Sequence, residues 1–423
     1  MKSIALFLWT SLSIILILSI ILGLVYFDFF SVHSSLFACG LVLLTFFIIP
    51  LVFKKSKRIT LRKYINFSIN VLFILLLIFL VIKSPGKPEQ FKNSKNEPLE
   101  NSISTWEKVE IGGIDQWLLI KGENKNNSVI LYLTGGYGQS CFYYMPHYYP
   151  QLEKDFTVVY WEQRGTGKSY NKEIPESSFT FKQLTSDINE ISIYLRNKFN
   201  KDKIILLGHS WGTSIGLLAS KEYPENFQFF IGIGQFVNWE MNCSAKYYGL
   251  LAKSEAENNK DAIAQIKSLG EPPYEQKDKS QKDKVLNNWA DYFSGSEFER
   301  NWKRIERSLY LNCPEYNLSE KIMIKSHNLL YQIYDKSTRL DFFNETNNFE
   351  IPIYFVQGEN DYCTVTSVVE EYYNSITAPD KDLLILKDSG HDPNFVHPQE
   401  FHKYLLSKLK ITQSSNPIFK IEL

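Results

Sequence analysis

A serine lies at the centre of the stretch Gly208-His209-Ser210-Trp211-Gly212, which has the spacing Gly-x-Ser-x-Gly. A serine hydroxyl is a weak nucleophile at neutral pH, so it needs a nearby base. The apolar run 204–207 precedes this stretch, and a helix-compatible run at 213–221 follows it. A strand, a sharp turn and a helix are the context in which this spacing exposes a nucleophile. We therefore predict that Ser210 is a catalytic nucleophile and not part of an ordinary glycine-containing turn.

Two later segments carry an acid and a base at positions that suit this nucleophile. The strand-like segment 353–357 is followed by Asp361, and the strand-like segment 383–387 is followed by His391. A histidine can take the serine proton, and a carboxylate holds that histidine in the productive orientation. Sites of parallel sheets lie at the carboxyl ends of strands. We predict Asp361 as the acid and His391 as the base, with Glu359 as an alternative acid.

Three other histidines could compete for the role of base. His209 precedes the serine directly, but we expect the turn to direct its side chain elsewhere. His147 and His397 follow no suitable strand-like segment, and we interpret them as ordinary residues or as the lining of a pocket. The pattern therefore favours His391.

A glycine-rich loop can supply the groups that stabilise negative charge on a substrate oxygen. The segment Thr134-Gly135-Gly136-Tyr137-Gly138 follows the strand-like run 128–133. Stabilisation requires two backbone N–H groups aimed at the developing oxyanion. We predict that Trp211, directly after the nucleophile, donates one of them. Gly136 is predicted to donate the other, with Tyr137 as the alternative.

Short strands and helices alternate around these residues. Apolar runs of strand length are found at 116–121, 128–134, 156–161, 203–208, 228–233, 351–356 and 383–386. The spacing of apolar residues predicts a helix over 179–199. Strands that alternate with helices favour a mostly parallel sheet covered on both faces, which is an α/β fold.

The charged, aromatic-rich segment 236–349 interrupts this alternation. Its runs have helical spacing, and Glu271-Pro272-Pro273-Tyr274 breaks them. We predict one α/β core formed by residues 105–235 and 350–423, with 236–349 inserted as a helical cap. The cap would shape the substrate pocket.

The first 82 residues differ in composition from the rest of the chain. Three apolar runs, 4–27, 36–53 and about 65–82, approach the length of about 20 residues that spans a bilayer as a helix. We predict three transmembrane helices in 1–82 that anchor the chain. A cleaved signal peptide is the alternative for the first run, but two further runs follow it.

The distribution of basic residues predicts the orientation of this anchor. Lysines and arginines concentrate in the connection 54–63, whereas the connection 28–35 has none. Basic connections stay on the cytoplasmic side, so the chain after Ile82 is expected on the extracytoplasmic side of the cell membrane. Residues 83–104, rich in Pro, Lys, Asn and Ser, are expected to form a flexible linker.

Composition argues against several classes of function. The chain of 423 residues has 46 acidic and 46 basic residues and no net charge, which gives no reason to expect a nucleic-acid partner. None of the five cysteines forms a Cys-x-x-Cys pair, and no His-Glu-x-x-His motif is present. We therefore expect neither a metal nor a cofactor. Whether the cysteines pair stays open, with free thiols favoured.

Taken together, the motifs resemble those of the α/β-hydrolase superfamily, and in particular its proline-iminopeptidase-like branch. The resemblance rests on the stretch around Ser210 and on Trp161-Glu162-Gln163-Arg164-Gly165-Thr166-Gly167-Lys168-Ser169, and it covers about residues 105–411. It implies that Arg164 and its neighbours buttress the site. The chain departs from the branch at Thr134, Tyr137 and Glu162, where His, Pro and Asp are typical. These departures weaken any transfer of proline specificity.

The resulting hypothesis is a membrane-anchored serine hydrolase that cleaves an amide or ester through an acyl-enzyme. The resemblance favours an aminopeptidase of the proline-iminopeptidase type acting on a small molecule or short peptide. Tyr137 would line its pocket, and Glu240 would bind the free α-ammonium group. An esterase or lipase acting on amphiphilic acyl esters is the alternative. A non-catalytic binding or sensing protein on a hydrolase scaffold is the alternative from another class.

Overall fold

The computed structural model describes residues 86–274, 276–294, 297–317, 320–321, 324, 328–333 and 340–414. The chain divides into two compact units. One unit comprises residues 1–87 and 304–321, and the other comprises residues 88–303 and 322–423. The second unit contains the sheet and all of the predicted site residues.

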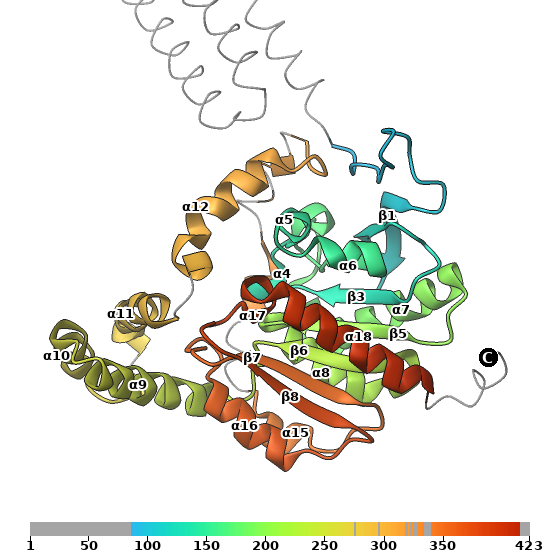
Figure 1. The fold of residues 1–423 in the computed structure, drawn as a ribbon. Helices are drawn as coiled ribbons and strands as arrows, with labels where there is room; N and C mark the ends of the chain where they lie inside the picture. Colours follow the sequence, from blue (N-terminus) through green and yellow to red (C-terminus); the bar gives the residue numbers. More distant parts are fainter. Residues whose placement is uncertain are drawn as a thin grey trace, which may run out of the picture. The chain divides into compact units, whose positions relative to one another are not determined.

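An eight-stranded sheet forms the centre of the second unit, with the strand order β1-β2-β4-β3-β5-β6-β7-β8 (Figure 1). The strands are β1 (Ile103–Ile111), β2 (Ile114–Gly122), β3 (Val129–Leu133), β4 (Thr157–Glu162), β5 (Ile204–His209), β6 (Phe227–Ile233), β7 (Ile353–Gly358) and β8 (Lys381–Leu386). Strand β2 pairs antiparallel with β1 and β4, and all other pairs are parallel. The sheet is therefore mostly parallel, as predicted.

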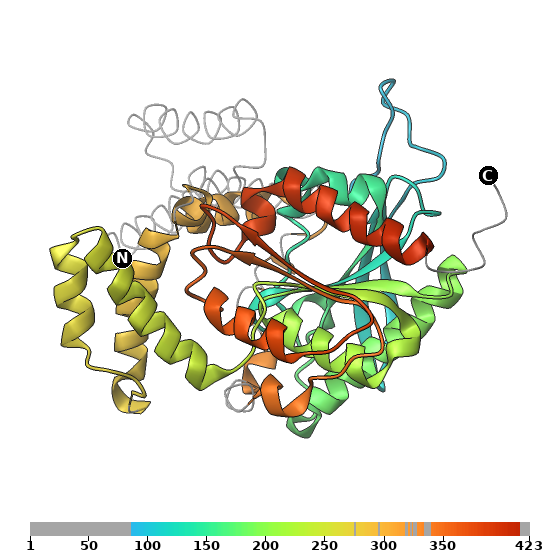
Figure 2. The ribbon, with the colours of Figure 1, turned by 60° about the horizontal axis from the view of Figure 1, so that its bottom comes forward.

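Helices cover both faces of this sheet. Figure 2 shows α6 (Pro150–Asp155) and α18 (Pro398–Ser414) over one face, with α7 (Phe181–Phe199), α8 (Trp211–Glu222) and α16 (Thr366–Ser375) over the other. The sequence accounts for α7: Leu184, Ile188, Ile191 and Leu195 are buried at helical spacing. The Thr180 side chain caps its first turn by accepting a hydrogen bond from the Gln183 N–H at 3.1 Å.

The register of the parallel strands brings their carboxyl ends to one edge. Leu133 of β3 pairs with Gly208 of β5, and Gly208 pairs with Gly232 of β6. Gly232 pairs in turn with Phe355 of β7. Every predicted site residue except Glu240 follows one of these strands within a few positions, so the register gathers them at this edge.

Several short helices lie in the connections of the second unit. They are α4 (Gly135–Gly138), α5 (Met145–Tyr148), η1 (Gly167–Ser169), η2 (Glu176–Ser178), η3 (Pro224–Asn226), η4 (Leu330–Ile333), α15 (Phe342–Glu345) and α17 (Pro393–Val396). Helices α4 and α17 flank the strand-end edge, because α4 follows β3 and α17 follows β8.

The described part of the segment between β6 and β7 is mostly helical. Its long helices are α9 (Trp239–Ala256), α10 (Lys260–Ser268), α11 (Gln276–Phe293) and α12 (Glu297–Asn312). Helices α9, α10 and α11 enclose a small core of their own, made of Tyr247, Leu250, Ala262, Ile266, Leu286 and Phe293. The predicted break at 271–274 separates α10 from α11.

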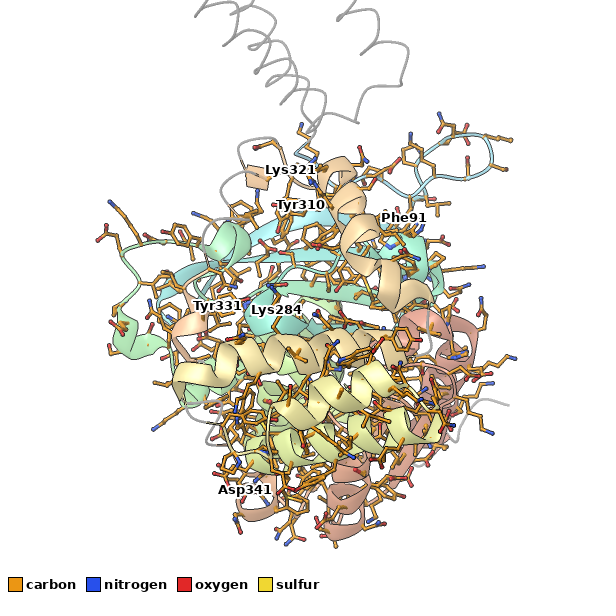
Figure 3. The ribbon with its side chains drawn as sticks, turned by 90° about the vertical axis from the view of Figure 1, so that its left-hand side faces the viewer. Phe91, Lys284, Tyr310, Lys321, Tyr331 and Asp341 are labelled. Carbon is orange, nitrogen blue, oxygen red and sulfur yellow. The ribbon has the colours of Figure 1, made fainter. Side chains whose placement is uncertain are left out.

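The described part of the first unit is small. It contains the end of α12 and the turn after it, where the rings of Tyr310 and Tyr316 meet edge to face with centroids 6.1 Å apart. The Tyr310 hydroxyl donates a hydrogen bond to the carbonyl of Lys321 at 2.8 Å (Figure 3). These contacts fix the end of α12 against the residues that follow it.

The predicted membrane segments lie outside the described residues. The runs 4–27, 36–53 and 65–82 all precede residue 86, where the description begins. Within the described ranges, no helix has the length and apolar character needed to cross a bilayer.

The described part of the segment predicted as a flexible linker makes contacts with the start of β1. The Gln90 amide donates to the carbonyl of Ser104 at 2.8 Å, and the Ser104 hydroxyl donates to the carbonyl of Glu89 at 2.7 Å. A β-bridge joins Lys92 and Pro98. The flexibility of this segment stays a prediction.

Candidate active site

The predicted nucleophile lies on a strained turn between β5 and α8. Ser210 has φ 51° and ψ −119°, in the region of positive φ that non-glycine residues rarely adopt. Two glycines make the turn possible. A Cβ on Gly208 would lie 2.7 Å from the Gly212 carbonyl oxygen, and one on Gly212 would lie 2.1 Å from the Leu133 carbonyl oxygen. Both positions therefore exclude any side chain.

The structure brings the three predicted triad residues into one hydrogen-bonded chain. His391 Nε2 lies 2.8 Å from Ser210 Oγ, and His391 Nδ1 lies 2.9 Å from Asp361 Oδ2. These distances fit a base that accepts the serine proton and an acid that orients the base. The alternative acid, Glu359, is exposed, and its carboxylate accepts a hydrogen bond from the Asp388 N–H instead.

The loop after β7 holds the Asp361 carboxylate in a fixed orientation. Asp361 is 2% exposed. Its Oδ1 accepts hydrogen bonds from the N–H groups of Cys363 and Thr364 at 2.8 and 2.9 Å. The Thr364 hydroxyl donates to Oδ2 at 2.8 Å. Oδ2 is therefore shared between this hydroxyl and the imidazole.

The pKa of His391 is raised above its ordinary value. Burial alone would lower it, but the neighbouring Cys363 sulfur and the Asp361 carboxylate outweigh that effect because both favour the imidazolium. An imidazole whose protonated form is stabilised in this way suits a residue that must accept a proton during the reaction.

The glycine-rich loop after β3 lies beside the nucleophile. A Cβ on Gly135 would be 3.2 Å from Ser210 Cβ, so the loop backbone approaches the serine closely. Gly136 and Tyr137 both have positive φ, at 55° and 52°. Trp211 is the first residue of α8, where backbone N–H groups lack partners within the helix. The N–H groups predicted for the oxyanion thus belong to two segments that meet at Ser210.

Aromatic side chains surround this loop. The Tyr137 ring lies 4.6 Å from the Trp211 ring and 5.3 Å from the Tyr331 ring, measured between centroids. The Phe181 ring lies 5.6 Å from Trp211. Asn328 donates a hydrogen bond from its side-chain amide to the carbonyl of Tyr137 at 3.1 Å. At position 137, where the resembled branch has proline, this chain therefore places a tyrosine ring against Trp211, the residue after Ser210.

The Gln-Arg-Gly stretch after β4 supports the site from within the core. Gln163 Oε1 accepts a hydrogen bond from the Trp211 indole at 3.2 Å. Arg164 is 1% exposed and donates to both carboxylate oxygens of Asp187, at 3.0 and 2.9 Å. It also donates to the carbonyl of Gly112 at 3.0 Å. These contacts support the buttressing role that the resemblance implied.

Glu240 lies in the first turn of α9 and is exposed. No contact that the structure describes joins it to the triad, so its role stays a prediction. Two residues later, Asn242 does reach the site. Its side chain accepts from the Val365 N–H and donates to the Cys363 carbonyl, both at 2.7 Å. Sequence reasoning missed this bond between α9 and the loop of Asp361, because an asparagine on a helix carries no recognisable signal.

The other histidines occupy different surroundings. His147 is exposed on α5, and His397, directly after α17, has its Nε2 2.7 Å from the Lys387 carbonyl oxygen. His209, in contrast, packs against His391, with ring centroids 5.2 Å apart. The expectation that the turn directs its side chain elsewhere did not anticipate this contact.

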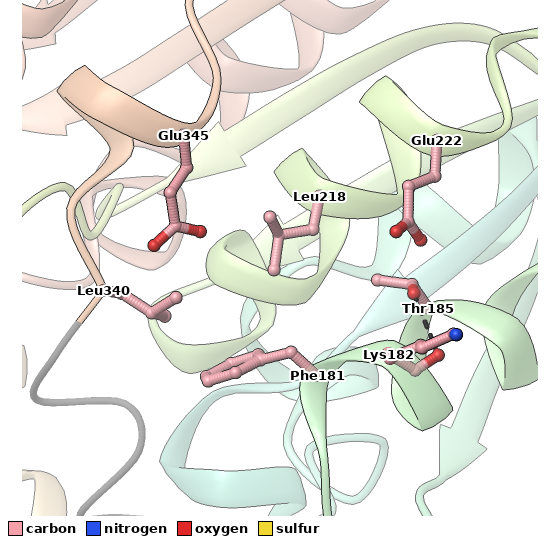
Figure 4. A pocket seen from close by; sticks show the side chains of 7 residues that line it. All are labelled: Phe181, Lys182, Thr185, Leu218, Glu222, Leu340 and Glu345. Atoms are coloured by element: carbon pink, nitrogen blue, oxygen red, sulfur yellow. Dashed lines mark hydrogen bonds between the residues drawn. The ribbon is translucent and has the colours of Figure 1, made fainter.

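A cavity of about 360 Å³ lies between α7, α8 and the segment that includes α15. Its lining consists of apolar, hydroxyl and charged side chains: Phe181, Lys182, Thr185, Leu218, Glu222, Leu340 and Glu345. Figure 4 shows the two glutamates on either side of Leu218. Phe181 is common to this cavity and to the aromatic group around Trp211.

Comparison with known proteins places these observations in context. A family profile for the alpha/beta hydrolase fold matches residues 128–398. A Bacillus subtilis (strain 168) protein named "Probable aminopeptidase YbaC" is 27% identical over 312 residues, covering 72% of this chain and 96% of that protein. The proline iminopeptidase of Heyndrickxia coagulans is 22% identical over 287 residues, covering 66% of this chain and 89% of that protein.

Solved structures agree with this fold. A crystal structure of a proline iminopeptidase-related protein from Thermus thermophilus matches with a TM-score of 0.51 at 18% identity, covering 73% of this chain and 98% of that one. The profile and these relatives confirm the resemblance that the motifs around Ser210 and Arg164 indicated.

Proposed function

Because the chain belongs to the α/β hydrolase family, we propose that it is a serine hydrolase that cleaves an amide or ester bond through an acyl-enzyme. The observation that carries the proposal is the hydrogen-bonded chain from Ser210 through His391 to Asp361, with distances of 2.8 and 2.9 Å. A serine on a positive-φ turn, a base hydrogen-bonded to that serine and a buried acid hydrogen-bonded to the base have few other uses in combination.

The reaction follows from this arrangement. His391 Nε2 takes the proton of Ser210 as Oγ attacks the substrate carbonyl, and Asp361 stabilises the imidazolium that forms. The N–H groups of Trp211 and Gly136 bind the resulting oxyanion. His391 then protonates the leaving group, which departs as an amine or alcohol. A water molecule, deprotonated by His391, finally hydrolyses the acyl-enzyme.

Within this class we favour an aminopeptidase. The support comes from the relatives named as aminopeptidases and from the motifs shared with proline iminopeptidases. An aminopeptidase must bind a free α-ammonium group, and Glu240 at the start of α9 is the carboxylate we assign to it. Tyr137 would line the pocket for the first residue of the substrate.

One observation favours an esterase as the second candidate. The rings of Tyr137, Trp211 and Tyr331 form an apolar, aromatic surface next to the oxyanion loop. Such a surface suits a hydrophobic acyl group as well as an amino-acid side chain.

We also propose that the enzyme is anchored in the cell membrane by three helices in residues 1–82, with its catalytic unit on the extracytoplasmic side. The apolar runs and the basic connection at 54–63 support this topology. Protease added to intact protoplasts should digest the catalytic unit. Complete protection in intact protoplasts, with digestion after lysis, would contradict the orientation.

The test of the activity uses the full chain in detergent with paired substrates. Proline and other aminoacyl naphthylamides are compared with short and long acyl esters, and a fluorophosphonate probe reports whether Ser210 is nucleophilic. We expect labelling and turnover that both disappear in Ser210→Ala, with faster cleavage of the amides. Faster cleavage of esters would favour the second candidate. A wild-type chain that the probe does not label would support a non-catalytic binding protein.

A further inference from the structure

A second histidine–aspartate pair lies beside the proposed base. His209, the last residue of β5, is 7% exposed. Its Nε2 lies 3.2 Å from Oδ1 of Asp392 and 3.2 Å from the carbonyl oxygen of His391. The centroids of the two imidazole rings are 5.2 Å apart. His209 therefore contacts both the backbone carbonyl and the ring of His391.

The surroundings of His209 define which nitrogen carries its proton. Both neighbours of Nε2 are oxygen acceptors, so Nε2 bears the hydrogen and donates it to them. Nδ1 of His209 faces the glycine-rich loop after β3, because a Cβ on Gly135 in that loop would lie only 3.0 Å from Nδ1. His209 is thereby fixed between the loop of Gly135 on one side and the backbone of His391 on the other.

Asp392 remains ionised in this position. Burial alone would raise the pKa of its carboxyl, but the hydrogen bond from His209 and the electrostatic interactions with the His209 and His391 side chains lower the pKa below its ordinary value. The groups that face His391 come from three places: Asp361 and Cys363 from the loop after β7, His209 and Ser210 from the turn between β5 and α8, and the adjacent Asp392.

We propose that His209 is a positioning residue for His391, and that Asp392 adds a second negative charge that stabilises the imidazolium. His209 holds the carbonyl of His391, so the imidazole stays within hydrogen-bond reach of Ser210. The proton passes from Ser210 Oγ to His391 Nε2 and then to the leaving group, while His209 keeps its own. The inference rests on the proposed function, since it concerns the same base.

The experiment compares His209→Ala and His209→Gln with the wild-type full chain. We expect kcat to fall about ten- to hundredfold in His209→Ala, the size of effect that misplacing a catalytic group produces, with KM changed less than about threefold. His209→Gln keeps an amide N–H near the position of Nε2 and should recover most of kcat. Asp392→Asn should move the acid limb of the kcat/KM profile to lower pH. His147→Ala, an exposed histidine outside the site, is the matched control.

The outcomes separate this inference from the function on which it rests. Wild-type kcat in His209→Ala would overturn the inference, and so would equal losses in the alanine and glutamine variants together with a raised KM. The thermal midpoint of each variant reports whether the chain is folded. If the alanine variant does not fold, a folded His209→Gln whose kcat falls more than about tenfold would overturn the inference, because it keeps an N–H near the position of Nε2. An unlabelled wild-type chain would contradict the proposed function and overturn the inference with it.

Discussion

Asp361 and Asp187 are both buried carboxylates that accept several hydrogen bonds, but they lie in regions with different partners. Asp187 binds a guanidinium through two hydrogen bonds and also accepts from Gln116 and Gln183, at 2.9 and 2.8 Å. Asp361 binds backbone N–H groups, a hydroxyl and an imidazole. Asp187 binds a guanidinium that is always charged, whereas the imidazole beside Asp361 is charged only when both of its ring nitrogens are protonated.

The difference separates structural electrostatics from chemistry. A permanent ion pair between Arg164 and Asp187 gives the core a fixed geometry, and it takes no proton from the reaction. In the proposed reaction, His391 becomes positively charged beside Asp361 when Ser210 loses its proton. We therefore expect Asp187 to affect the stability of the fold and Asp361 to affect the rate of the proposed reaction. Substitutions at the two positions should separate these effects.

Asp361→Asn should give the largest change. An amide at this position cannot stabilise the imidazolium and favours the wrong tautomer of His391, so we expect kcat to fall about 10⁴-fold. The thermal midpoint should stay close to that of the wild type. Steady-state kinetics with the best substrate of the panel measures the loss. A kcat within tenfold of wild type would mean that another group, such as Glu359, orients the base.

Asp187→Ala should affect stability and not chemistry. Removing the carboxylate leaves the Arg164 guanidinium buried without its charged partner, which costs about 3–5 kcal/mol in the free energy of unfolding. Denaturant unfolding measures this loss. Asp115→Ala, which breaks the exposed pair with Lys108 (2.9 Å), is the control and should cost about 1 kcal/mol or less. Equal costs for the two substitutions would contradict the role of the buried pair.

The pH dependence of kcat/KM should next show how strongly the neighbours of His391 favour its protonated form. The neutral imidazole is the form that accepts the serine proton, so activity is lost as pH falls through the pKa of His391. Because that pKa is raised, the midpoint of the acid limb should lie above the ordinary histidine value of 6.5. A midpoint below 6.5 would show that burial dominates over the two neighbouring groups. The Cys363→Ser variant should still lose activity at low pH, but the midpoint of that loss should move toward lower pH.

Asn242→Ala should give the smallest effect. It removes the two hydrogen bonds from α9 to the loop of Asp361, and a loss of about 1 kcal/mol corresponds to a fall in kcat of roughly fivefold. Asn287→Ala, an exposed asparagine on α11, is the matched control. An unchanged kcat in Asn242→Ala would show that the loop holds Asp361 without help from the helical segment.

The sheet could be predicted from the sequence because its strands are continuous apolar runs. The predicted runs coincide with β2 to β8 within a few residues, and the helix over 179–199 coincides with α7. β1 was not predicted as a strand. Its sequence, Ile103–Ile111, mixes charged and apolar residues at the edge of the sheet, where most of its residues are partly or fully exposed. It therefore lacks the continuous apolar run that strands buried on both faces show.

The triad could be predicted because chain order and strand ends constrain its members. The contacts of His209 and Asn242 could not, since they depend on side-chain directions across elements that are distant in sequence. His209 lies next to Ser210 in the chain but acts across 182 positions, on the backbone of His391. The contacts of a residue can be predicted from the sequence only when the residue belongs to a known motif. His209 and Asn242 make their contacts outside any such motif.

The close approach at Gly212 limits how the enzyme can diversify. Backbone atoms of the nucleophile's helix and of the strand before the oxyanion loop are in contact there, with no room for a methyl group. In the proposed mechanism, the helix that carries the attacking serine and the strand before the loop that binds the oxyanion are therefore held together by direct backbone contact. Under this proposal, adaptation to a new substrate would come from the side chains around this contact, and Tyr137 is one such position.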